Sequence, residues 1–285
     1  MNDRHSSARL VAYALPYGPI VAANTAILVF LAPLYSAERG IALTLVGVIL
    51  TVTRFADVIL DGLAGVISDR LRTRWPRRKF WIAIGLPLFA IGVFMMLVPP
   101  GNAGPLYLFV SLLIFYVGYS LMLVNHMAWG AELSEDYDER VRVQSFAHIV
   151  FMLFLIATLA LPVVLDQLGP STHGVRSAAV GALIIGGIIP FALMALRFAP
   201  EERAAPSAHT SAREMILQCF RNAPFRRLLA IDFVSAFYGG AVASLYVLFA
   251  TLVLGAGKTA SLGLLAYFVS GALGIPFWRA LSSRF

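Results

Sequence analysis

Cysteine is almost absent from this sequence, and its scarcity excludes several kinds of chemistry. Cys219 is the only cysteine among 285 residues, so we expect neither an internal disulfide nor a cysteine metal cluster. His126 and His148 lie in different predicted helices and are expected to be packed, hydrogen-bonded residues rather than metal ligands. We therefore predict no redox chemistry, no resident metal and no cofactor.

The residue patterns of an enzyme are missing as well. No nucleophile with a nearby base stands out, and the run GAGK at 255–258 lacks the full spacing of a phosphate-binding loop. We accordingly predict a protein that is not an enzyme and has no catalytic residues.

Charged residues are also few, and this fixes the class of protein. Only 13% of residues are charged while 59% are hydrophobic, and the mean hydropathy is +0.81. A soluble domain must cover its surface with polar groups and has a different balance. The composition is that of an integral membrane protein.

Long runs without Asp, Glu, Lys or Arg predict eight membrane-spanning helices, because a span must satisfy its own backbone hydrogen bonds. The uncharged run 80–131 divides into two helices at the turn sequence VPPGNAGP, residues 98–105. The other six spans are Leu10–Ala37, Gly40–Ser68, Val143–Leu165, Ser177–Leu196, Leu228–Gly257 and Thr259–Trp278. The fold class expected is an all-α polytopic membrane protein.

The basic residues predict the orientation of these helices. With the N-terminus in the cytoplasm, nearly all Lys and Arg fall in cytoplasmic segments, above all in RLRTRWPRRK, residues 70–79. Only Arg39, Arg176 and Lys258 fall on the opposite face, which is the distribution that the positive-inside rule favours. The net charge of +7 is therefore a topology signal, and no nucleic-acid partner is expected.

A polar stretch divides the chain. Residues 197–227 are predicted to be a cytoplasmic linker between a six-helix bundle, residues 1–196, and a partial second bundle, residues 228–285. The exits of helix two (GVISDRLRTR) and helix eight (WRALSSRF) resemble each other six helices apart, as in transporters with repeated halves. Such a fold needs four further helices, so we expect a truncated or partial chain.

Three charged residues interrupt the second predicted span, in the run TRFADVILDG at 53–62. A charge near the bilayer centre costs roughly 2.5 to 3.5 kcal/mol on insertion scales, so these side chains are expected to face the protein interior. Asp57 and Asp61 are spaced i, i+4 on one face, and Arg54 precedes Asp57 by three. This pattern suits reversible binding of Na⁺ or H⁺; the alternative is an Arg–Asp pair that only locks two helices together.

Polar residues of two other helices are candidates for contact with a solute. Asn125 and Trp129 lie one turn apart in the fourth span. Asn125 offers a neutral amide oxygen and is predicted to join Asp57 and Asp61 in binding the cation, while the indole of Trp129 either stacks on a sugar ring or packs between helices. In the first span, prolines and a glycine surround Tyr17 and weaken the helix, so Tyr17 and Asn24 are expected to line the path. Asn24 has the alternative role of a helix–helix contact.

These residues resemble a known family. The run TRFADVILDGLAGVISDRLRTRWPRRKFWIAIG, residues 53–85, is similar without a gap to the signature of the glycoside-pentoside-hexuronide cation symporters, a branch of the major facilitator superfamily. A second similarity is WGAELSEDYDERVRVQ, residues 129–144. The resemblance covers the whole chain and about two-thirds of a full family member.

The resemblance implies a role for each matching position. Asp57 and Asp61 correspond to the cation-site carboxylates, Asn125 to a third, sugar-contacting carboxylate of melibiose permease, and Trp129 to a sugar-pocket tryptophan. Arg54 is interpreted as a structural partner of the aspartates. The cytoplasmic gate motif, whose charges pair with the opposite half in the family, corresponds to Gly65, Asp69, Arg70, Arg77 and Arg78.

The sequence also departs from the family. Gly62 replaces the usual proline after the second aspartate, and Ile20, Val21 and Val150 stand where the permease has charged side chains. These changes leave galactoside specificity unsupported, and related animal proteins carry lysolipids.

We therefore expect a monomeric inner-membrane symporter that couples Na⁺ or H⁺ to the uptake of a sugar or glycoside-like solute by alternating access. The alternatives are transport of a non-sugar solute such as a lysolipid, and a non-transporting fragment or membrane binding partner. The partners expected are the solute, the coupling cation and the lipid bilayer.

Overall fold

The first six predicted spans are helices in the computed structural model of the protein. It describes residues 5–71, 75–169, 171–202 and 220–253, with isolated positions at 263, 266, 270 and 274. The chain forms two compact units, Met1–Ala205 and Pro206–Phe285, and their boundary falls inside the linker predicted at 197–227. Every regular element in the described residues is helical, as the sequence predicted.

The first unit holds all the helices that contain the predicted site. They are α1 (Ser7–Ala14), α2 (Tyr17–Ala26), α3 (Leu43–Arg70), α4 (Arg77–Leu97), α5 (Pro105–Glu132), α6 (Tyr137–Leu168) and α7 (His173–Phe198). Six segments of the described chain are long and apolar enough to cross a membrane: Ser7–Leu31 and the five helices α3 to α7. The chain is therefore a multi-pass membrane protein.

Local sequence explains where these helices begin and end. Pro105 occupies the first turn of α5, where its missing N–H costs nothing and its fixed φ suits a helix. The side chains of Asp136 and Thr172 cap α6 and α7 by accepting hydrogen bonds from Glu139 N and Val175 N. Residues that favour the start of a helix therefore stand at the beginnings of α5, α6 and α7.

The first span is less regular than predicted. It is interrupted at Leu15 and Pro16, and after α2 it continues in two π-helical turns, η1 (Ile27–Leu31) and η2 (Leu34–Glu38). Pro16 cannot donate a backbone hydrogen bond, which explains the break before α2. At the end of η2, the carboxylate of Glu38 accepts a 2.7 Å hydrogen bond from Gly174 N in the first turn of α7.

The second unit contains α9 (Ala223–Leu252). Asn222 caps this helix by accepting a hydrogen bond from Phe225 N, and Pro224 occupies its first turn. The seventh predicted span, Leu228–Gly257, lies largely within α9. The eighth, Thr259–Trp278, falls outside the described residues except for four single positions.

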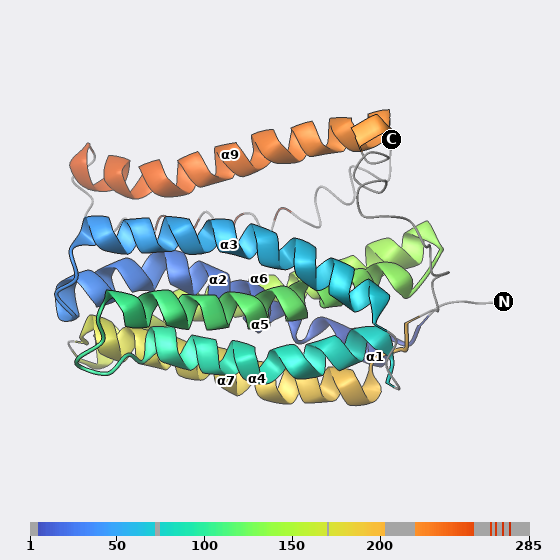
Figure 1. Cartoon of the computed structure of the whole chain (residues 1–285), viewed down its shortest axis with the longest axis horizontal. Helices are drawn as coiled ribbons and strands as arrows, with labels where there is room; N and C mark the ends of the chain where they lie inside the picture. The colour runs from blue at the N-terminus through green and yellow to red at the C-terminus, as the bar shows by residue number, and fades with distance from the viewer. Residues whose placement is uncertain are drawn as a thin grey trace. The chain divides into compact units, whose positions relative to one another are not determined.

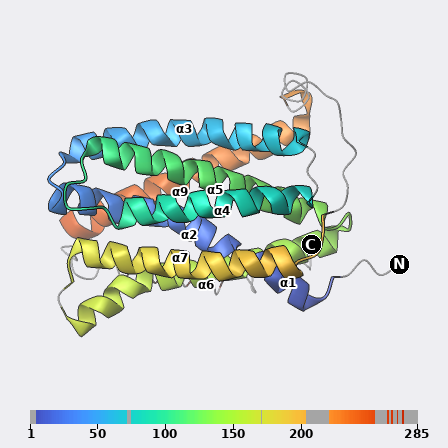
Figure 2. The ribbon, with the colours of Figure 1, turned by 60° about the horizontal axis from the view of Figure 1, so that its bottom comes forward.

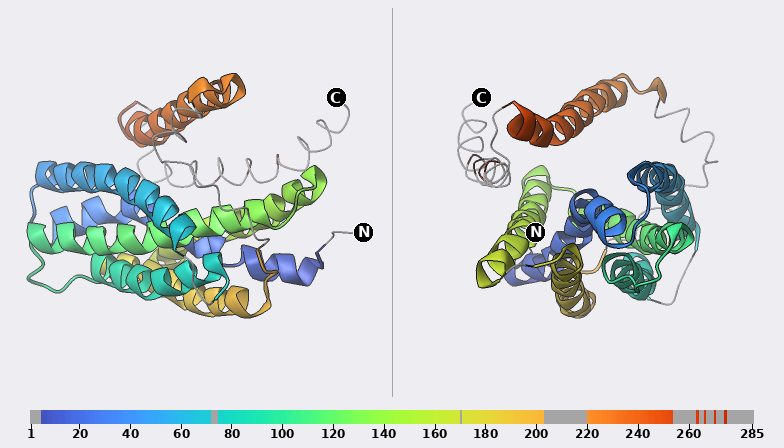
Figure 3. Two further views of the ribbon diagram at one scale, coloured as in Figure 1. Left: turned by 45° about the vertical axis from the view of Figure 1, so that its right-hand side comes forward. Right: turned by 90° about the vertical axis from the view of Figure 1, so that its left-hand side faces the viewer.

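The helices of the first unit run side by side with alternating direction (Figures 1 and 2). As a result, the ends of α3, α5 and α7 and the beginnings of α4 and α6 gather at one end of this unit. The end-on view in Figure 3 shows α2 enclosed by its neighbours, and it packs on α5, α6 and α7. The segments predicted to be cytoplasmic therefore lie together.

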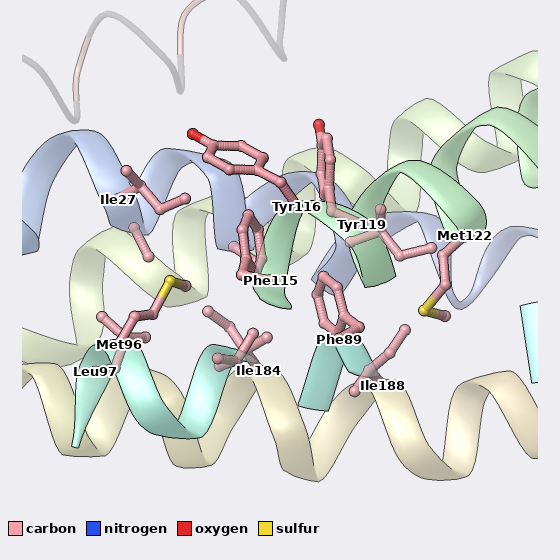
Figure 4. Packing of buried hydrophobic residues seen from close by; sticks show 14 of the residues in the cluster. Ile27, Phe89, Met96, Leu97, Phe115, Tyr116, Tyr119, Met122, Ile184 and Ile188 are labelled. Atoms are coloured by element: carbon pink, nitrogen blue, oxygen red, sulfur yellow. The ribbon is translucent and has the colours of Figure 1, made fainter. Parts of the chain in front are cut away.

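The tightest helix pair is α4 with α5, and glycines make it possible. A Cβ added at Gly92 would collide with the backbone of Phe115, and one added at Gly118 would collide with the backbone of Phe89. Around this contact, Figure 4 shows Phe89, Phe115, Met122, Ile184 and Ile188 packed into one apolar cluster. The hydroxyl groups of Tyr116 and Tyr119 point away from that cluster (Figure 4).

Candidate functional site

The charged residues of α3 form a hydrogen-bonded cluster with α2 and α5. Arg54 Nη1 donates to Asp57 Oδ2 at 3.3 Å and to Asn24 Oδ1 at 2.9 Å. Asn24 Nδ2 in turn donates to the hydroxyl of Tyr119 at 3.3 Å. The spacing i, i+3 brings Arg54 to Asp57 within α3, and the polar chain connects three helices.

Asp57 is the most enclosed charged member of this cluster, with 6% of its surface exposed. Its other oxygen, Oδ1, lies 3.5 Å from Ser120 Oγ on α5. The Arg54 guanidinium also lies over the ring of Tyr116, 6.0 Å from its centre, a distance that suits a cation–π contact. Both oxygens of Asp57 are thus engaged.

Asp61 lies one turn further along α3 and differs from Asp57. Its Oδ1 atom is buried and has no hydrogen-bond partner among the described residues. A buried carboxylate oxygen without a partner is costly, and a bound cation or proton would remove that cost. Oxygen atoms, above all those of carboxylates, are the ligands that hard cations prefer.

The charges of the cluster do not cancel. Arg54 carries one positive charge, whereas Asp57 and Asp61 carry two negative charges when both are ionised. One monovalent cation or one proton therefore neutralises the cluster. In the described part of the chain, no group of three or more His, Cys, Asp and Glu side chains could hold a metal ion.

An apolar groove of about 400 Å³ opens beside Arg54. It is lined by Ile27, Leu28, Leu50, Thr51, Arg54, Phe55, Val58 and Tyr116. The only charged group in this lining is the guanidinium, which is about half exposed. The groove therefore offers an apolar wall with one polar end next to the cluster.

Asn125 makes its side-chain contacts with Arg78 and with its own helix. Its Nδ2 donates to Leu121 O at 2.8 Å, and its Oδ1 accepts from Arg78 Nη1 at 3.4 Å. The structure thus groups Asn125 with the predicted gate rather than with Asp57 and Asp61. Its predicted role in cation binding stays a prediction.

The two aromatic candidates, Trp129 and Tyr17, are engaged in packing. Trp129 has no exposed surface, and its indole N–H donates to Pro200 O at 3.0 Å. Tyr17 stacks on His126 with ring centres 5.4 Å apart, and His126 is fully buried. In this structure the indole of Trp129 packs between elements. Its predicted contact with a sugar stays a prediction.

The predicted gate residues pair with one another and with α5. Arg78 lies 2.9 Å from Asp69 and also pairs with Glu132, while Arg77 lies 2.9 Å from Glu132 and 3.7 Å from Asp69. Gly65 faces Val124, and Arg70 ends α3. The resemblance implied pairing with the opposite half; the ion pairs found here lie inside the first unit.

Sequence reasoning missed Ser120, Tyr119 and Glu132. The two polar residues of α5 carry no charge and sit in an apolar run, so nothing marks them in the sequence. Glu132 could have been found from the sequence, because it is the one acidic residue of α5 and it ends that helix in a chain with a strongly basic segment at 70–79.

A helical bundle with a partly buried ionic cluster between its helices defines a polytopic membrane protein of the kind that handles ions or polar solutes. The family described as MFS/sugar transport protein matches residues 12–285, and the chain belongs to this family. It is a family of transporters, so the expectation that the chain is not an enzyme is confirmed.

Three curated relatives are similar to parts of the chain. An uncharacterized symporter of Synechocystis sp. is 32% identical over 152 residues, 50% of this chain and 28% of the relative. An inner membrane symporter of Escherichia coli is 24% identical over 199 residues, 67% and 43% of the two chains. An isoprimeverose transporter of Lactiplantibacillus pentosus is 27% identical over 169 residues, 56% and 35%. The chain covers less than half the length of each relative.

Proposed function

We propose that the protein is part of a cation-coupled symporter of the inner membrane, in which Asp57 and Asp61 bind Na⁺ or H⁺. The observation that carries this proposal is the buried Oδ1 of Asp61, which lacks a hydrogen-bond partner among the described residues. A helix lock needs only Arg54 and Asp57, so a second inward carboxylate has no role in it. A site that binds and releases a cation does need such an oxygen.

The arrangement supports exchange of one monovalent charge. Arg54 already balances Asp57 through their 3.3 Å contact, so the unbalanced charge belongs to Asp61. Binding a cation there changes the charge of a cluster that connects α2, α3 and α5. A ligand that binds one conformation better shifts the population toward it, which is how cation binding can promote solute binding.

The solute is proposed to be a sugar or a glycoside-like molecule. The family description names sugar transport, and one relative is named as a transporter of isoprimeverose. The groove beside Arg54 adds an apolar wall next to a polar cluster, which suits a solute with one apolar and one hydroxyl-rich side. Alternating access would expose this solute to each side of the membrane in turn.

Cation binding can be tested on the purified protein without knowing the solute. We expect Na⁺, or a shift in pH if the proton is the ligand, to raise the thermal unfolding temperature. Stabilisation amounts to about 2.7 kcal/mol when the ligand is at a hundred times its Kd. Asp61→Asn should abolish the effect, and Asp57→Asn should weaken or abolish it.

Asp69→Asn is the matched control, because Asp69 lies on the same helix but in the gate. It should leave the cation effect intact. An equal cation response in Asp61→Asn and the wild type would show that α3 carries no cation site. In uptake assays on cells that express the protein, concentrative uptake by both Asp57→Ala and Asp61→Ala would refute coupling at these residues.

A further inference from the structure

The first residues after α7 make specific contacts with two other helices. Lys79 Nζ on α4 donates to Leu196 O at 3.2 Å and to Ala199 O at 3.0 Å. The indole of Trp129 on α5 donates to Pro200 O at 3.0 Å. The last carbonyl groups of a helix have no partners within it, so Lys79 and Trp129 provide the donors that the end of α7 lacks.

Helix α4 has the opposite requirement at its beginning. Its first backbone N–H groups need acceptors, and the residue that precedes it, Pro76, has no side chain that can cap. Glu202 fills this place from the linker, because both of its carboxylate oxygens lie 3.0 Å from Arg78 N. A carboxylate at a helix N-terminus is also favoured by the helix dipole.

Arg78 is thus held by two separate sets of contacts. Its guanidinium pairs with Asp69 and Glu132 and donates to Ser68 Oγ at 3.1 Å. Its backbone N–H is fixed by Glu202, which is 124 residues away along the chain. The side chain is oriented by α3 and α5, whereas the backbone is oriented by the start of the linker.

We propose that Lys79, Trp129, Pro200 and Glu202 form a linker clasp in which Glu202 is a positioning residue for the gate arginine Arg78. The clasp joins the segment that leads to the second unit to the helix that begins with the gate. It also gives Trp129 a role that uses its only hydrogen-bond donor. A pull on the linker would then act first on the backbone of Arg78.

This inference rests on the proposed function only where it concerns a gate. The test of the clasp measures the exchange of backbone amides. The clasp can therefore be refuted while the cation effect at Asp61 is observed, and the cation effect can be absent while the clasp is found.

Amide hydrogen exchange on the whole purified protein tests the clasp. In Glu202→Ala, the amides of the first turn of α4 should exchange about fivefold faster, the usual consequence of losing a cap. Glu202→Gln keeps an acceptor oxygen and should restore exchange to within twofold of the wild type. Glu201→Ala is the matched control: Glu201 is exposed and acts on Lys79 through its charge. The acceptor for Arg78 N is Glu202, so in this control exchange in the first turn of α4 should stay within twofold of the wild type.

Equal exchange in Glu202→Ala and the wild type would overturn the proposal, and so would equal acceleration by Glu201→Ala. A second readout covers the case in which Glu202→Ala does not fold. With Trp75, Trp81 and Trp278 replaced by Phe, the fluorescence of Trp129 reports on the clasp.

The fluorescence readout depends on the ionisation of Glu202. The pH profile of Trp129 emission should differ between the protein with Glu202 and the Glu202→Gln variant, and His126, whose ring lies 6.4 Å from that of Trp129, is present in both. Identical pH profiles in the two backgrounds would show that Glu202 does not act on the clasp. Lys79→Gln should increase quenching of Trp129 by acrylamide severalfold, and unchanged quenching would contradict the role given to Lys79.

Discussion

Two carboxylates one turn apart on α3 have different surroundings, and this difference assigns them different tasks. Asp57 contacts Arg54 and Ser120, so its charge is balanced within the protein. Asp61 keeps a buried oxygen without a partner in the described residues. Under the proposed function, we therefore expect the charge of Asp57 to stay balanced by Arg54 and the charge of Asp61 to be the one that cation binding neutralises.

Ser120 offers a further test of the cluster at the level of one hydroxyl group. Ser120→Ala removes an oxygen 3.5 Å from Asp57 and should weaken cation affinity by roughly fivefold, since a hydrogen bond contributes about 1 kcal/mol. Cation titrations followed by thermal unfolding measure this. Ser111→Ala is the control, because Ser111 is equally buried on α5 but donates to Leu108 O; similar losses in both variants would argue against Ser120 as part of the site.

Glu202 predicts a pH dependence of stability. Burial raises the pKa of its carboxyl above the ordinary value, and repulsion from Glu132 adds to this, while Arg78 N and the charges of Arg77 and Arg78 oppose it. The folded chain therefore binds this proton more tightly than the unfolded chain does. Its stabilising contribution is complete below the ordinary pKa and declines as the pH rises through the raised pKa.

In Glu202→Gln this part of the pH dependence should disappear. Lys79 also faces this carboxyl and is present in both proteins, so the comparison between them isolates Glu202. Thermal unfolding of the two proteins between about pH 3 and 8, an interval that begins below the ordinary glutamate pKa of about 4.3 and extends well above it, measures the difference. If the unfolding temperatures of the wild type and Glu202→Gln depend on pH in the same way, the role given to Glu202 in the pH dependence is refuted.

At the scale of helices, the pairing of α4 with α5 depends on two glycines. Gly118→Ala places a methyl group against the backbone of Phe89, which cannot move aside as a side chain can. We expect a loss of about 1 to 3 kcal/mol, typical of overpacking, measured by thermal unfolding. Gly62→Ala is the control: a Cβ there meets nothing within 4 Å, and the variant should be as stable as the wild type or slightly more so.

Much of the helical order was predictable, and the departures have local causes. The turn at 98–105 separated α4 from α5 because proline and glycine end helices wherever they occur. The predicted start of the third span at Phe80 was three residues late, because Arg77, Arg78 and Lys79 are polar and were excluded although they form the first turn of α4. The π-helical turns in the first span leave no mark in hydropathy.

The site was harder to predict than the helices. Periodicity showed that Asp57 and Asp61 share a face, and the structure brings Asn24 to Arg54 beside them. It could not show which neighbouring helix each face meets. The contacts of Asn125 with Arg78 and of Trp129 with Pro200 therefore could not be predicted from helical periodicity.

At the scale of the whole molecule, the orientation in the membrane remains to be measured. In a Cys219→Ser background, Asn102→Cys should react with an impermeant thiol reagent added outside intact cells, and Glu135→Cys should react only after the cells are opened. Both positions are exposed, at opposite ends of the helices they flank. The opposite labelling pattern would show that the basic segments face outward, against the positive-inside rule.

The π-helical turns between Ile27 and Glu38 have a consequence for how the sequence can vary. A wide turn accommodates an additional residue, and each residue of a helix corresponds to a rotation of about 100°. Deleting one residue from the first wide turn, η1, would convert it to an α-helical turn and leave Glu38 close to its present angular position, with its hydrogen bond from Gly174 N kept. This segment should therefore tolerate the loss of one residue, whereas a deletion in a regular helix turns every following side chain by about 100°.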